Sequence, residues 1–323
     1  MRANFWLLDS CSLLPRYDAG MMKREVRHIP VLMREVIAAL EPERGKVIVD
    51  CTVGLGGHSA ELWRLIKPKG RLIGIDFDPG NLALARAKLE KVGKGFELYH
   101  NNFAALPTVL MEAGVERVDG VLADLGVASP QIDDPARGFS YRRPGPLDMR
   151  MDPTRGQPAS ILVNRLNEKD LAEAILEYGD ETDAAKIARL IVRRREEQPI
   201  VTTQDLMAIV CQARDFTIER AAGAKLHPAA RTFQALRILV NREMGNLEHL
   251  LKVLPSCLRP GGRAAIISFH SGEDRRVKKS FQTGERSGVY EEVSDNVIVA
   301  EEEEIENNPR SRSAKLRWAR LSA

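Results

Sequence analysis

The sequence predicts an α/β fold, in which helices cover a parallel sheet and a further helical segment is inserted. From residue 46 onward, short β-rich runs alternate with segments of helical period, the pattern typical of such sheets. Residues 129–158 interrupt this alternation with six prolines and are not expected to form regular structure. Residues 159–222 then have the pattern of helices only, and a strand-like run returns at 264–269. The α/β pattern therefore resumes after a helical excursion.

Length and composition place the chain among ordinary globular proteins. It has 323 residues, of which 44% are hydrophobic and 29% charged, and a formal net charge of +3. At roughly 100 to 200 residues per domain, this length predicts one large or two medium domains. No apolar run approaches the roughly 18 residues needed to span a bilayer, so no membrane partner is expected. The four cysteines include no C-x-x-C pair, which argues against a disulfide framework or zinc ribbon and favours a cytoplasmic location.

Residues 1–22 are predicted to be a disordered N-terminal extension that takes no part in the fold. Their apolar run, Phe5–Leu8, is too short for a secretory signal. Met21 and Met22 immediately precede a charged, helix-like segment, where the folded part is expected to begin.

The remaining elements are predicted in chain order. Strand-like runs occupy 47–50, 71–76, 96–101 and 120–124, and helical segments occupy 58–66 and 81–92. After His227 one long helix is predicted, with leucines along one side and Arg-Pro-Gly-Gly at 259–262 closing it. Lys315 to Leu321 alternates like a strand and is expected at an edge of the sheet, with its arginines presenting positive charge. The sheet domain is thus expected to comprise 23–132 and 228–323, and the inserted proline-rich loop and helical domain 133–227.

A glycine-rich loop lies between the first strand and the following helix. Its glycines, Gly54, Gly56 and Gly57, let the backbone turn sharply and approach a ligand, and the next helix offers free N–H groups at its start. Such loops bind nucleotide-like cofactors, although a tight structural turn is the alternative for an isolated loop of this kind.

Two acidic residues favour S-adenosylmethionine as the cofactor. Asp76 ends the second strand, where a carboxylate can accept both ribose hydroxyls of an adenosine, in NAD as well as in S-adenosylmethionine. Asp50 precedes the glycine loop and suits a cationic, amino-acid-bearing cofactor better than a pyrophosphate. Ser59 also stands where a dinucleotide fingerprint requires its third glycine. An NAD-dependent oxidoreductase of similar architecture is the alternative.

A second candidate site follows the fourth strand. Ligands of open α/β sheets collect outside the carboxyl ends of the strands, so Asp124 is expected to face the reacting groups. A helix-cap or turn aspartate is the alternative. With Ser129 and Pro130, Asp124 resembles the polar-Pro motif of methyltransferases that act on exocyclic amines. A carboxylate there can hydrogen-bond the amine and take part in removing its proton, so these three residues are the catalytic candidates.

A series of longer motifs runs through residues 28–320. The motifs are Val31-Leu32 with Glu35, Thr52 to Ser59, Asp124 to Gln131, Arg137 to Ser140, Gly145 to Asp152, His227 to Ile238, Ser268 to Ser271 and Asn308 to Ser313. In this order they resemble those of the bacterial 16S ribosomal RNA cytosine-N4 methyltransferases. So many motifs in one order make coincidence a poor explanation.

The resemblance implies a Rossmann-like class I S-adenosylmethionine-dependent methyltransferase sheet with an inserted all-helical domain. It implies methyl transfer to N4 of a specific cytidine in the decoding centre of 16S ribosomal RNA, with the RNA or the small ribosomal subunit as partner. The helical insertion is then expected to help recognise RNA. The residues that the family implies for the cofactor are Gly56, Gly57, His58, Asp76, Phe103, Asp124 and Gln131, to which the loop itself adds Asp50 and Gly54.

The proline-rich loop carries candidates for RNA contact. Its guanidinium groups can pair with phosphates while an aromatic ring stacks on an unpaired base. The alternative is a rigid loop whose arginines pair with its own aspartates. The candidates are Arg137, Phe139, Tyr141, Arg143 and Arg150.

Three further residues complete the expected substrate side. Arg231 lies in one of the family motifs, and His270 and Ser271 end the last parallel strand, where a capped turn is the alternative. No cluster of His, Cys, Asp and Glu has ligand spacing, so no metal is predicted. A catalytically silent RNA-binding assembly factor with the same fold is a third reading, and the sequence leaves a homodimer open.

Overall fold

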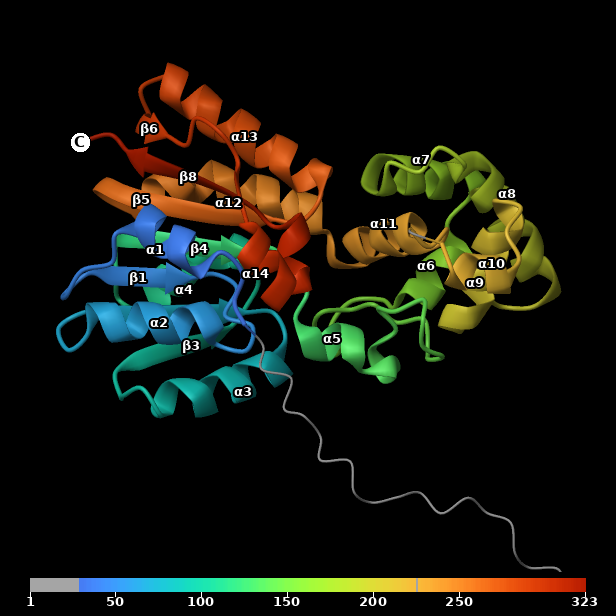
Figure 1. Cartoon of the computed structure of the whole chain (residues 1–323), viewed down its shortest axis with the longest axis horizontal. Helices are drawn as coiled ribbons and strands as arrows, with labels where there is room; N and C mark the ends of the chain where they lie inside the picture. Colours follow the sequence, from blue (N-terminus) through green and yellow to red (C-terminus); the bar gives the residue numbers. More distant parts are fainter. Residues whose placement is uncertain (1–28, 225) are drawn as a thin grey trace, which may run out of the picture.

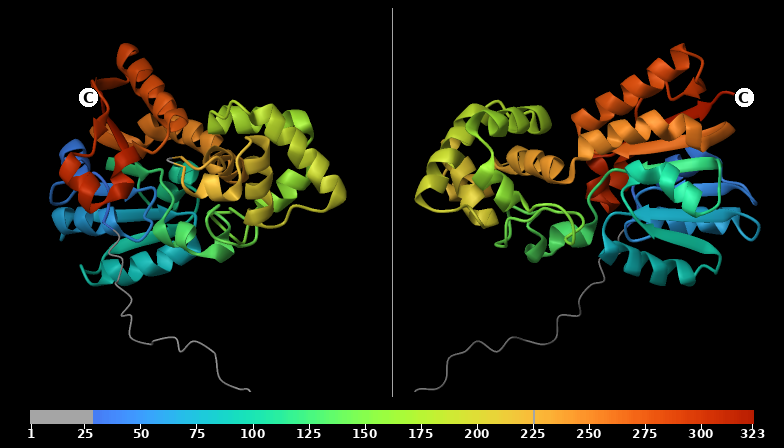
Figure 2. Two further views of the ribbon diagram at one scale, coloured as in Figure 1. Left: turned by 45° about the vertical axis from the view of Figure 1, so that its right-hand side comes forward. Right: turned by 180° about the vertical axis from the view of Figure 1, so that it is seen from behind.

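The computed structural model describes residues 29–224 and 226–323, which form two lobes side by side (Figure 1). One lobe is a sheet with helices on both faces, and the other is made of helices only. Figure 2 shows the same two lobes from two further directions, with the proline-rich loop running between them. The expected N-terminal extension, 1–22, lies outside the described residues.

The sheet has eight strands, and its first five run parallel. The order is β3-β2-β1-β4-β5-β8-β6, with β7 paired to β8 as well. β8 runs antiparallel to β5, β6 and β7. The strands are β1 Val47–Asp50, β2 Arg71–Asp76, β3 Phe96–His100, β4 Val118–Asp124, β5 Leu258–Ser268, β6 Tyr290–Val293, β7 Ile298–Val299 and β8 Lys315–Leu321. This topology confirms the predicted α/β, Rossmann-like class.

The strand order reverses between β1 and β4, which pair directly. In such sheets ligands bind where the order reverses, outside the carboxyl ends of the strands. The loops after β1 and β4 are the two in which the sequence placed its cofactor and catalytic candidates. The topology therefore brings the two candidate segments together.

Helices cover both faces of the sheet and divide its core in two. One face packs against α1 Met33–Leu40, α2 Gly57–Ile66 and α3 Pro79–Glu90, through residues such as Leu62 and Leu89. The other packs against α4 Leu106–Glu112, α12 Glu243–Cys257 and α13 Ser271–Arg286, through residues such as Leu250 and Phe281. Burial on both faces explains why the parallel strands are nearly continuous apolar runs.

The helical lobe has an apolar core of its own. Its buried residues include Leu171, Ile187, Leu206 and Phe233. The helices are α6 Ala159–Arg165, α7 Glu168–Gly179, α8 Ala184–Glu197, α9 Thr203–Ala213, α10 Ile218–Ala222 and α11 Ala230–Asn241. Leu147 and Met149 of the proline-rich loop also belong to this core, so the loop is packed and not merely a linker.

The proline-rich loop begins with a short helix and then becomes irregular. α5 spans Ser129–Asp133 and the turn η2 spans Pro135–Arg137. The remaining short elements are η1 Phe103–Ala105, α14 Glu302–Asn307 and η3 Pro309–Ser313. The expectation of no regular structure was therefore wrong for the first residues of this loop.

The single long helix predicted after His227 is two helices. Arg242 adopts a left-handed conformation with φ 52° and ψ 38°, which ends α11 and begins α12. Phe233 and Leu236 of α11 pack in the helical lobe, whereas Leu247 and Leu250 of α12 pack under the sheet. The core of the helical lobe thus extends past residue 227, where the sequence placed its limit.

The prediction of an edge strand at 315–321 was right about the strand and wrong about its place. β8 lies between β5 and β6. Arg317 is buried and pairs with Asp274, 2.7 Å from Nε to Oδ1, and Arg320 pairs with Glu291 and Glu292. These arginines therefore meet carboxylates within the protein. Across the described residues, no helix combines the length and the apolar character needed to cross a bilayer.

Candidate active site

The glycine loop after β1 is held by its conformation and by close packing. Gly54 and Gly56 have φ of 53° and 74°, a region that glycine enters without steric cost. A Cβ on Gly56 would lie 3.2 Å from Cα of Ala85 on α3, and one on Gly57 would lie 2.5 Å from Cγ of Pro30. Gly57 lines the cleft described below, whereas Gly56 is not among its lining residues.

Asp50 lies behind the loop and does not line the cleft. It is 1% exposed, and its carboxylate accepts hydrogen bonds from Oγ of Ser59 at 2.5 Å and from the backbone N–H of Thr52 at 3.1 Å. Burial raises the pKa of Asp50, and these hydrogen bonds oppose that effect. In the structure Asp50 therefore shapes the loop and the start of α2.

Asp76 joins the loop to the end of β2. Its Oδ2 accepts the N–H of Gly54 at 2.6 Å, and its Oδ1 accepts the N–H of Asp78 at 2.8 Å. Burial raises the pKa of Asp76 to about 6, although these N–H groups and Asn81 oppose the rise. A carboxylate with oxygens at the cleft wall can accept further hydrogen bonds from the hydroxyls of a ligand.

Asp124 ends β4 on the other side of the β1 loop. Its backbone N–H donates to Oγ1 of Thr52 at 2.6 Å, and its Oδ2 lies 3.8 Å from Nδ1 of His58. Burial raises the pKa of Asp124, an imidazolium at His58 lowers it, and the charge of Glu273 adds to the rise. The ring of His58 is fixed by a 2.8 Å contact from Nε2 to the carbonyl of Val31.

One cleft at the carboxyl ends of β1, β2 and β4 joins these groups. Its walls include all of the residues predicted for the cofactor except Asp50 and Gly56. The predicted residues that line it are Gly54, Gly57, His58, Asp76, Phe103, Asp124 and Gln131. Apolar and amide side chains share the wall with the carboxylates, among them Val53, Phe77 and Asn102.

Ser129 and Pro130 stand at the start of α5, next to the cleft wall and not in it. Ser129 is buried, and its hydroxyl accepts a hydrogen bond from the guanidinium of Arg310. The following Gln131 does line the cleft. Its Oε1 accepts the N–H of Ala128 at 2.9 Å, and its Nε2 donates to Oδ2 of Asp78 at 3.0 Å.

Four arginines of the proline-rich loop pair with carboxylates within the protein, namely Arg137, Arg143, Arg150 and Arg155. Arg137 lies 2.8 Å from Asp78 and donates to the carbonyls of Arg150 and Met151. Arg150 makes a bidentate pair with Asp148 at 2.8 and 2.7 Å. Arg143 contacts Asp133, but its side chain is 49% exposed. The alternative of a loop paired with its own aspartates thus describes Arg150, whereas Arg137 pairs with an aspartate from outside the loop.

The aromatic residues of the loop line a groove that adjoins the cleft. Tyr141 stacks on His227 with ring centroids 4.4 Å apart and meets Phe233 edge-on. Phe139, Tyr141 and Phe233 all line this groove, as does Arg237 of α11. Val127 lines both the groove and the cleft.

Arg231, His270 and Ser271 do not line the cleft, and two of them meet at Asp180. Arg231 donates to the Asp180 carbonyl at 2.9 Å, and Oγ of Ser271 donates to Oδ2 of Asp180 at 2.8 Å. His270 lies behind the wall, with Nε2 3.3 Å from Oε1 of Glu273.

Several residues that line the cleft or contact its wall were not foreseen from the sequence. Asp78 follows Asp76 and caps α3, but its partners Gln131 and Arg137 come from distant segments. Others are Asn102, Glu243, Glu273 and Arg310. Glu273 follows the Ser268 to Ser271 motif directly, which was the one available signal; Glu243 was hidden inside the supposed long helix.

The cleft residues fit S-adenosylmethionine. Asp76 can accept ribose hydroxyls, Phe77 and Phe103 offer apolar surface for a base, and the carboxylates of the cleft wall suit a sulfonium cation. Gly57 lets this part of the wall pack tightly against Pro30, because a side chain at position 57 would collide with Pro30.

Comparison with known proteins identifies the family of the chain. Residues 25–322 match the MraW methylase family. The chain belongs to this family. This membership confirms the resemblance seen in the motifs and, with it, S-adenosylmethionine as the cofactor; the NAD-dependent alternative has no support.

Close relatives extend over nearly the whole chain. "Ribosomal RNA small subunit methyltransferase H" of Sorangium cellulosum is 46% identical over 297 residues, covering 92% of this chain and 91% of the relative. The protein of the same name from Acidobacterium capsulatum is 45% identical over 304 residues, covering 92% and 99%. A solved structure of a putative rRNA-methylase from Clostridium thermocellum is similar with a TM-score of 0.42 and 12% identity, covering 90% of this chain and 94% of that one.

Proposed function

We propose that this methylase transfers the methyl group of S-adenosylmethionine to N4 of a specific cytidine in the decoding centre of 16S ribosomal RNA. The relatives that cover more than nine-tenths of the chain are named as ribosomal RNA small subunit methyltransferases. The position and the atom rest on the resemblance of the motifs and on the chemistry of the cleft.

The cofactor is proposed to occupy the half of the cleft between the β1 loop and β2. Asp76 would accept the ribose hydroxyls, and Phe103 and Gln131 would contact the adenosine part of the cofactor. When bound, S-adenosylmethionine supplies an electrophilic methyl group. Asp50 and Gly56 would act from behind, by fixing the loop that carries Gly54 and Gly57.

Asp124 is proposed to act on the acceptor amine. The lone pair of an aromatic amine is delocalised into the ring, so the nitrogen needs help to become a nucleophile. The Asp124 carboxylate can accept an N–H of the amine and favour its pyramidal form, and can then take the proton that leaves. Burial raises the pKa of Asp124, which makes it a better base than an exposed aspartate.

Ser129 and Pro130 support this site indirectly. The Ser129 hydroxyl is held by Arg310, and α5 places Gln131 in the cleft wall. We therefore propose that the two residues position the loop after Asp124 and leave proton transfer to Asp124. Phe139, Tyr141 and the exposed Arg143 are proposed to contact RNA beside the cleft.

The observation that carries the proposal is the meeting of Asp76 and Asp124 in one cleft of a methylase. In the decisive experiment, the protein and labelled S-adenosylmethionine are incubated with small ribosomal subunits that lack the modification. The nucleosides of the RNA are then analysed by mass spectrometry. We expect labelled N4-methylcytidine at one site. A different labelled nucleoside would refute the proposed acceptor, and cofactor binding without any label would favour the silent assembly factor.

A further inference from the structure

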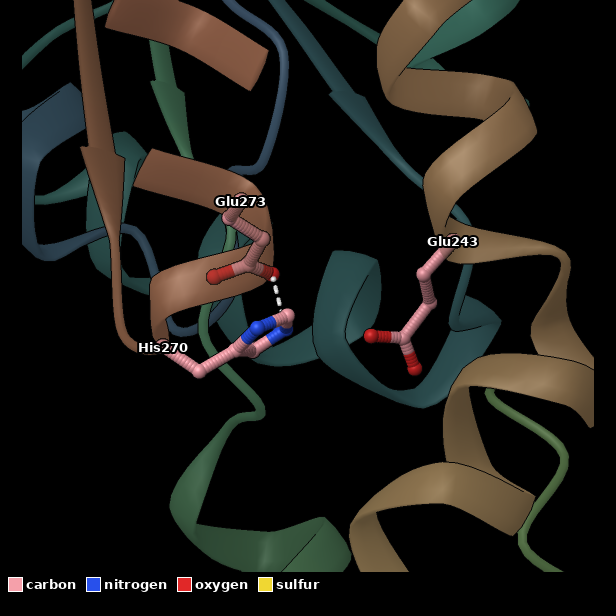
Figure 3. Close-up of side chains that lie close together, drawn as sticks. All are labelled: Glu243, His270 and Glu273. Atoms are coloured by element: carbon pink, nitrogen blue, oxygen red, sulfur yellow. Dashed lines mark ion pairs between the residues drawn. The ribbon is translucent and has the colours of Figure 1, made fainter. Parts of the chain in front are cut away.

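Three ionisable side chains at or behind the wall of the cleft have no role in the reaction proposed above. Glu243 begins α12, His270 precedes α13, and Glu273 lies in the first turn of α13 (Figure 3). Figure 3 shows His270 and Glu273 in contact, with Glu243 across from them. Glu243 and Glu273 both line the cleft that contains Asp124, and they are only 7% and 2% exposed.

Glu243 already has a strong partner. Arg237 of α11 donates from Nε to Oε1 at 2.9 Å and from Nη2 to Oε2 at 2.8 Å. Both oxygens of Glu243 are therefore engaged with a guanidinium that is itself largely shielded, at 18% exposure of its side chain. Such a bidentate pair compensates the burial of both charges.

Glu273 is less well compensated. Its Oε2 accepts the backbone N–H of Phe269 at 2.8 Å, which ties the start of α13 to the end of β5. Its Oε1 lies 3.3 Å from Nε2 of His270, and within residues 29–224 and 226–323 that nitrogen makes no hydrogen bond. Because Glu273 lines the cleft, this oxygen can accept a hydrogen bond from a bound ligand.

We propose that Glu273 is the second hydrogen-bond acceptor for the amine that Asp124 binds, and that it selects an amino group over a carbonyl at C4 of the target pyrimidine. The inference rests on the proposed function. An amino group has two N–H donors, and each of them needs an acceptor once the base leaves water for the cleft. Asp124 and Glu273 enter the same cleft from β4 and α13 and supply the two acceptors.

The same pair disfavours uridine. The C4 oxygen of uracil carries only lone pairs, so two carboxylates facing it would be left unpaired and would repel it. Sites built to bind a donor reject analogues that lack it much more strongly than apolar pockets discriminate by size.

A metal ion is the rival occupant, because ligand atoms of Glu243, His270 and Glu273 lie within 4.8 Å of one another. The Arg237 guanidinium argues against it. Both oxygens of Glu243 face that guanidinium, and a cation bound to them would be repelled by its charge.

The test compares the wild-type protein with Glu273→Gln and Glu273→Asp. Glutamine keeps an oxygen for the Phe269 N–H but puts a donor next to the amine, whereas aspartate keeps the charge and shortens the side chain. Each protein, saturated with S-adenosylhomocysteine to prevent turnover, is titrated with small-subunit RNA fragments that carry cytidine or uridine at the target position. Methyl transfer to the cytidine fragment and binding of S-adenosylmethionine are measured in parallel.

We expect the wild type to prefer cytidine RNA by about tenfold or more, and Glu273→Gln to lose most of this preference and to slow methyl transfer about 100-fold. Glu273→Asp should retain the preference. All three should bind S-adenosylmethionine alike. Glu285→Gln, on the exposed side of the same helix, is the matched control and should behave as wild type.

Other outcomes would overturn the inference. If Glu273 only caps α13, Glu273→Gln keeps the preference and Glu273→Asp is the damaged variant. If a chelator abolishes wild-type methyl transfer and a divalent cation restores it, the cluster is a metal site. If the wild type makes no N4-methylcytidine, the proposed function fails first, a result distinct from either of these.

Discussion

Asp124 is the residue on which the proposed chemistry depends most directly. We expect Asp124→Asn to reduce the rate of methyl transfer about 100-fold or more, because an amide cannot take the proton from the amine. Initial rates from nucleoside mass spectrometry measure the loss. Asp119→Asn is the control. Asp119 lies near the start of the same strand, where its carboxylate accepts the N–H of Val47, so it is at the end of the strand away from the cleft. A wild-type rate for Asp124→Asn would remove Asp124 from the mechanism.

We expect Asp76 to make cofactor binding depend on pH. Its pKa in the folded protein is raised by burial to about 6 from 3.8, so the carboxylate becomes neutral as the pH falls through about 6. A neutral acid accepts ribose hydroxyls less well, so the dissociation constant of S-adenosylmethionine should rise about tenfold per pH unit below that point. Calorimetric titration from pH 5 to 8 checks this.

The Asp76→Asn variant separates this titration from others in the cleft. It should bind the cofactor weakly at every pH, with a flat profile between pH 5 and 8. Acidification should weaken cofactor binding but should remove a cost to the stability of the free protein. The pKa of Asp76 is raised on folding, so burial of its charge lowers the free energy of unfolding above pH 6, and this loss disappears as the pH falls toward 4. A cofactor affinity that increased on acidification would contradict the assignment of Asp76.

The sequence indicates the site residues that stand at the ends of strands. It misses the site residues that tertiary packing brings to the cleft from distant segments. Asp76 and Asp124 could be found because each ends a β-rich run. Asp50 has the same pattern, yet its side chain turns inward to Ser59. Glu273 and Arg310 reach the cleft through tertiary packing, for which one sequence contains no periodic signal.

Among the elements, the proline-rich loop is anchored by one buried ion pair. Arg137 pairs with Asp78, whose side chain is 4% exposed, and also holds two loop carbonyls. Arg137→Ala should lower the free energy of unfolding by about 3 kcal/mol, because it leaves a buried carboxylate without its cation. Arg143→Ala should cost under about 1 kcal/mol, since its pair with Asp133 is half exposed. Urea denaturation of both variants measures the difference; equal losses would show that Arg137 is no anchor.

The junction between α11 and α12 depends on the left-handed backbone of Arg242, with φ 52°. Arg242→Val should lower the free energy of unfolding by about 1–2 kcal/mol, because a β-branched residue is strained there, and Arg242→Gly should not lower it. Lys252→Val, at an exposed position of α12, should cost only about 0.5 kcal/mol. Thermal unfolding compares the three. A similar loss for Arg242→Val and Lys252→Val would mean that the junction relaxes without strain.

These elements also show where prediction from sequence ends. The parallel strands were found because β-branched runs buried on both faces are distinctive. The break at Arg242 was missed because leucines continue with helical spacing through it, and arginine gives no sign of positive φ. The inner place of β8 was missed because Arg317 and Arg320 suggested solvent, whereas the structure surrounds them with Asp274, Glu291 and Glu292.

Over the whole molecule, the two lobes bring the cleft and the aromatic groove together. Val127 lines both, and Arg237 extends from the groove side to Glu243 in the cleft. If a target base is held near Asp124, the neighbouring nucleotides of the RNA would therefore lie close to Phe139 and Tyr141. Binding of RNA should combine stacking in the groove with phosphate contacts from exposed arginines.

These two contributions respond differently to salt. Arg142 is exposed at the groove, and Phe139 lines it. If Arg142 neutralises a phosphate, Arg142→Gln should reduce the slope of log affinity against log salt by about 0.7, the value for one contact on single-stranded RNA. Phe139→Leu should weaken binding about tenfold at every salt concentration without changing the slope, because stacking releases no counterions. Fluorescence anisotropy from 50 to 300 mM salt separates the two. An unchanged slope for Arg142→Gln, together with full affinity for Phe139→Leu, would place the RNA path away from the groove and outside the space between the lobes.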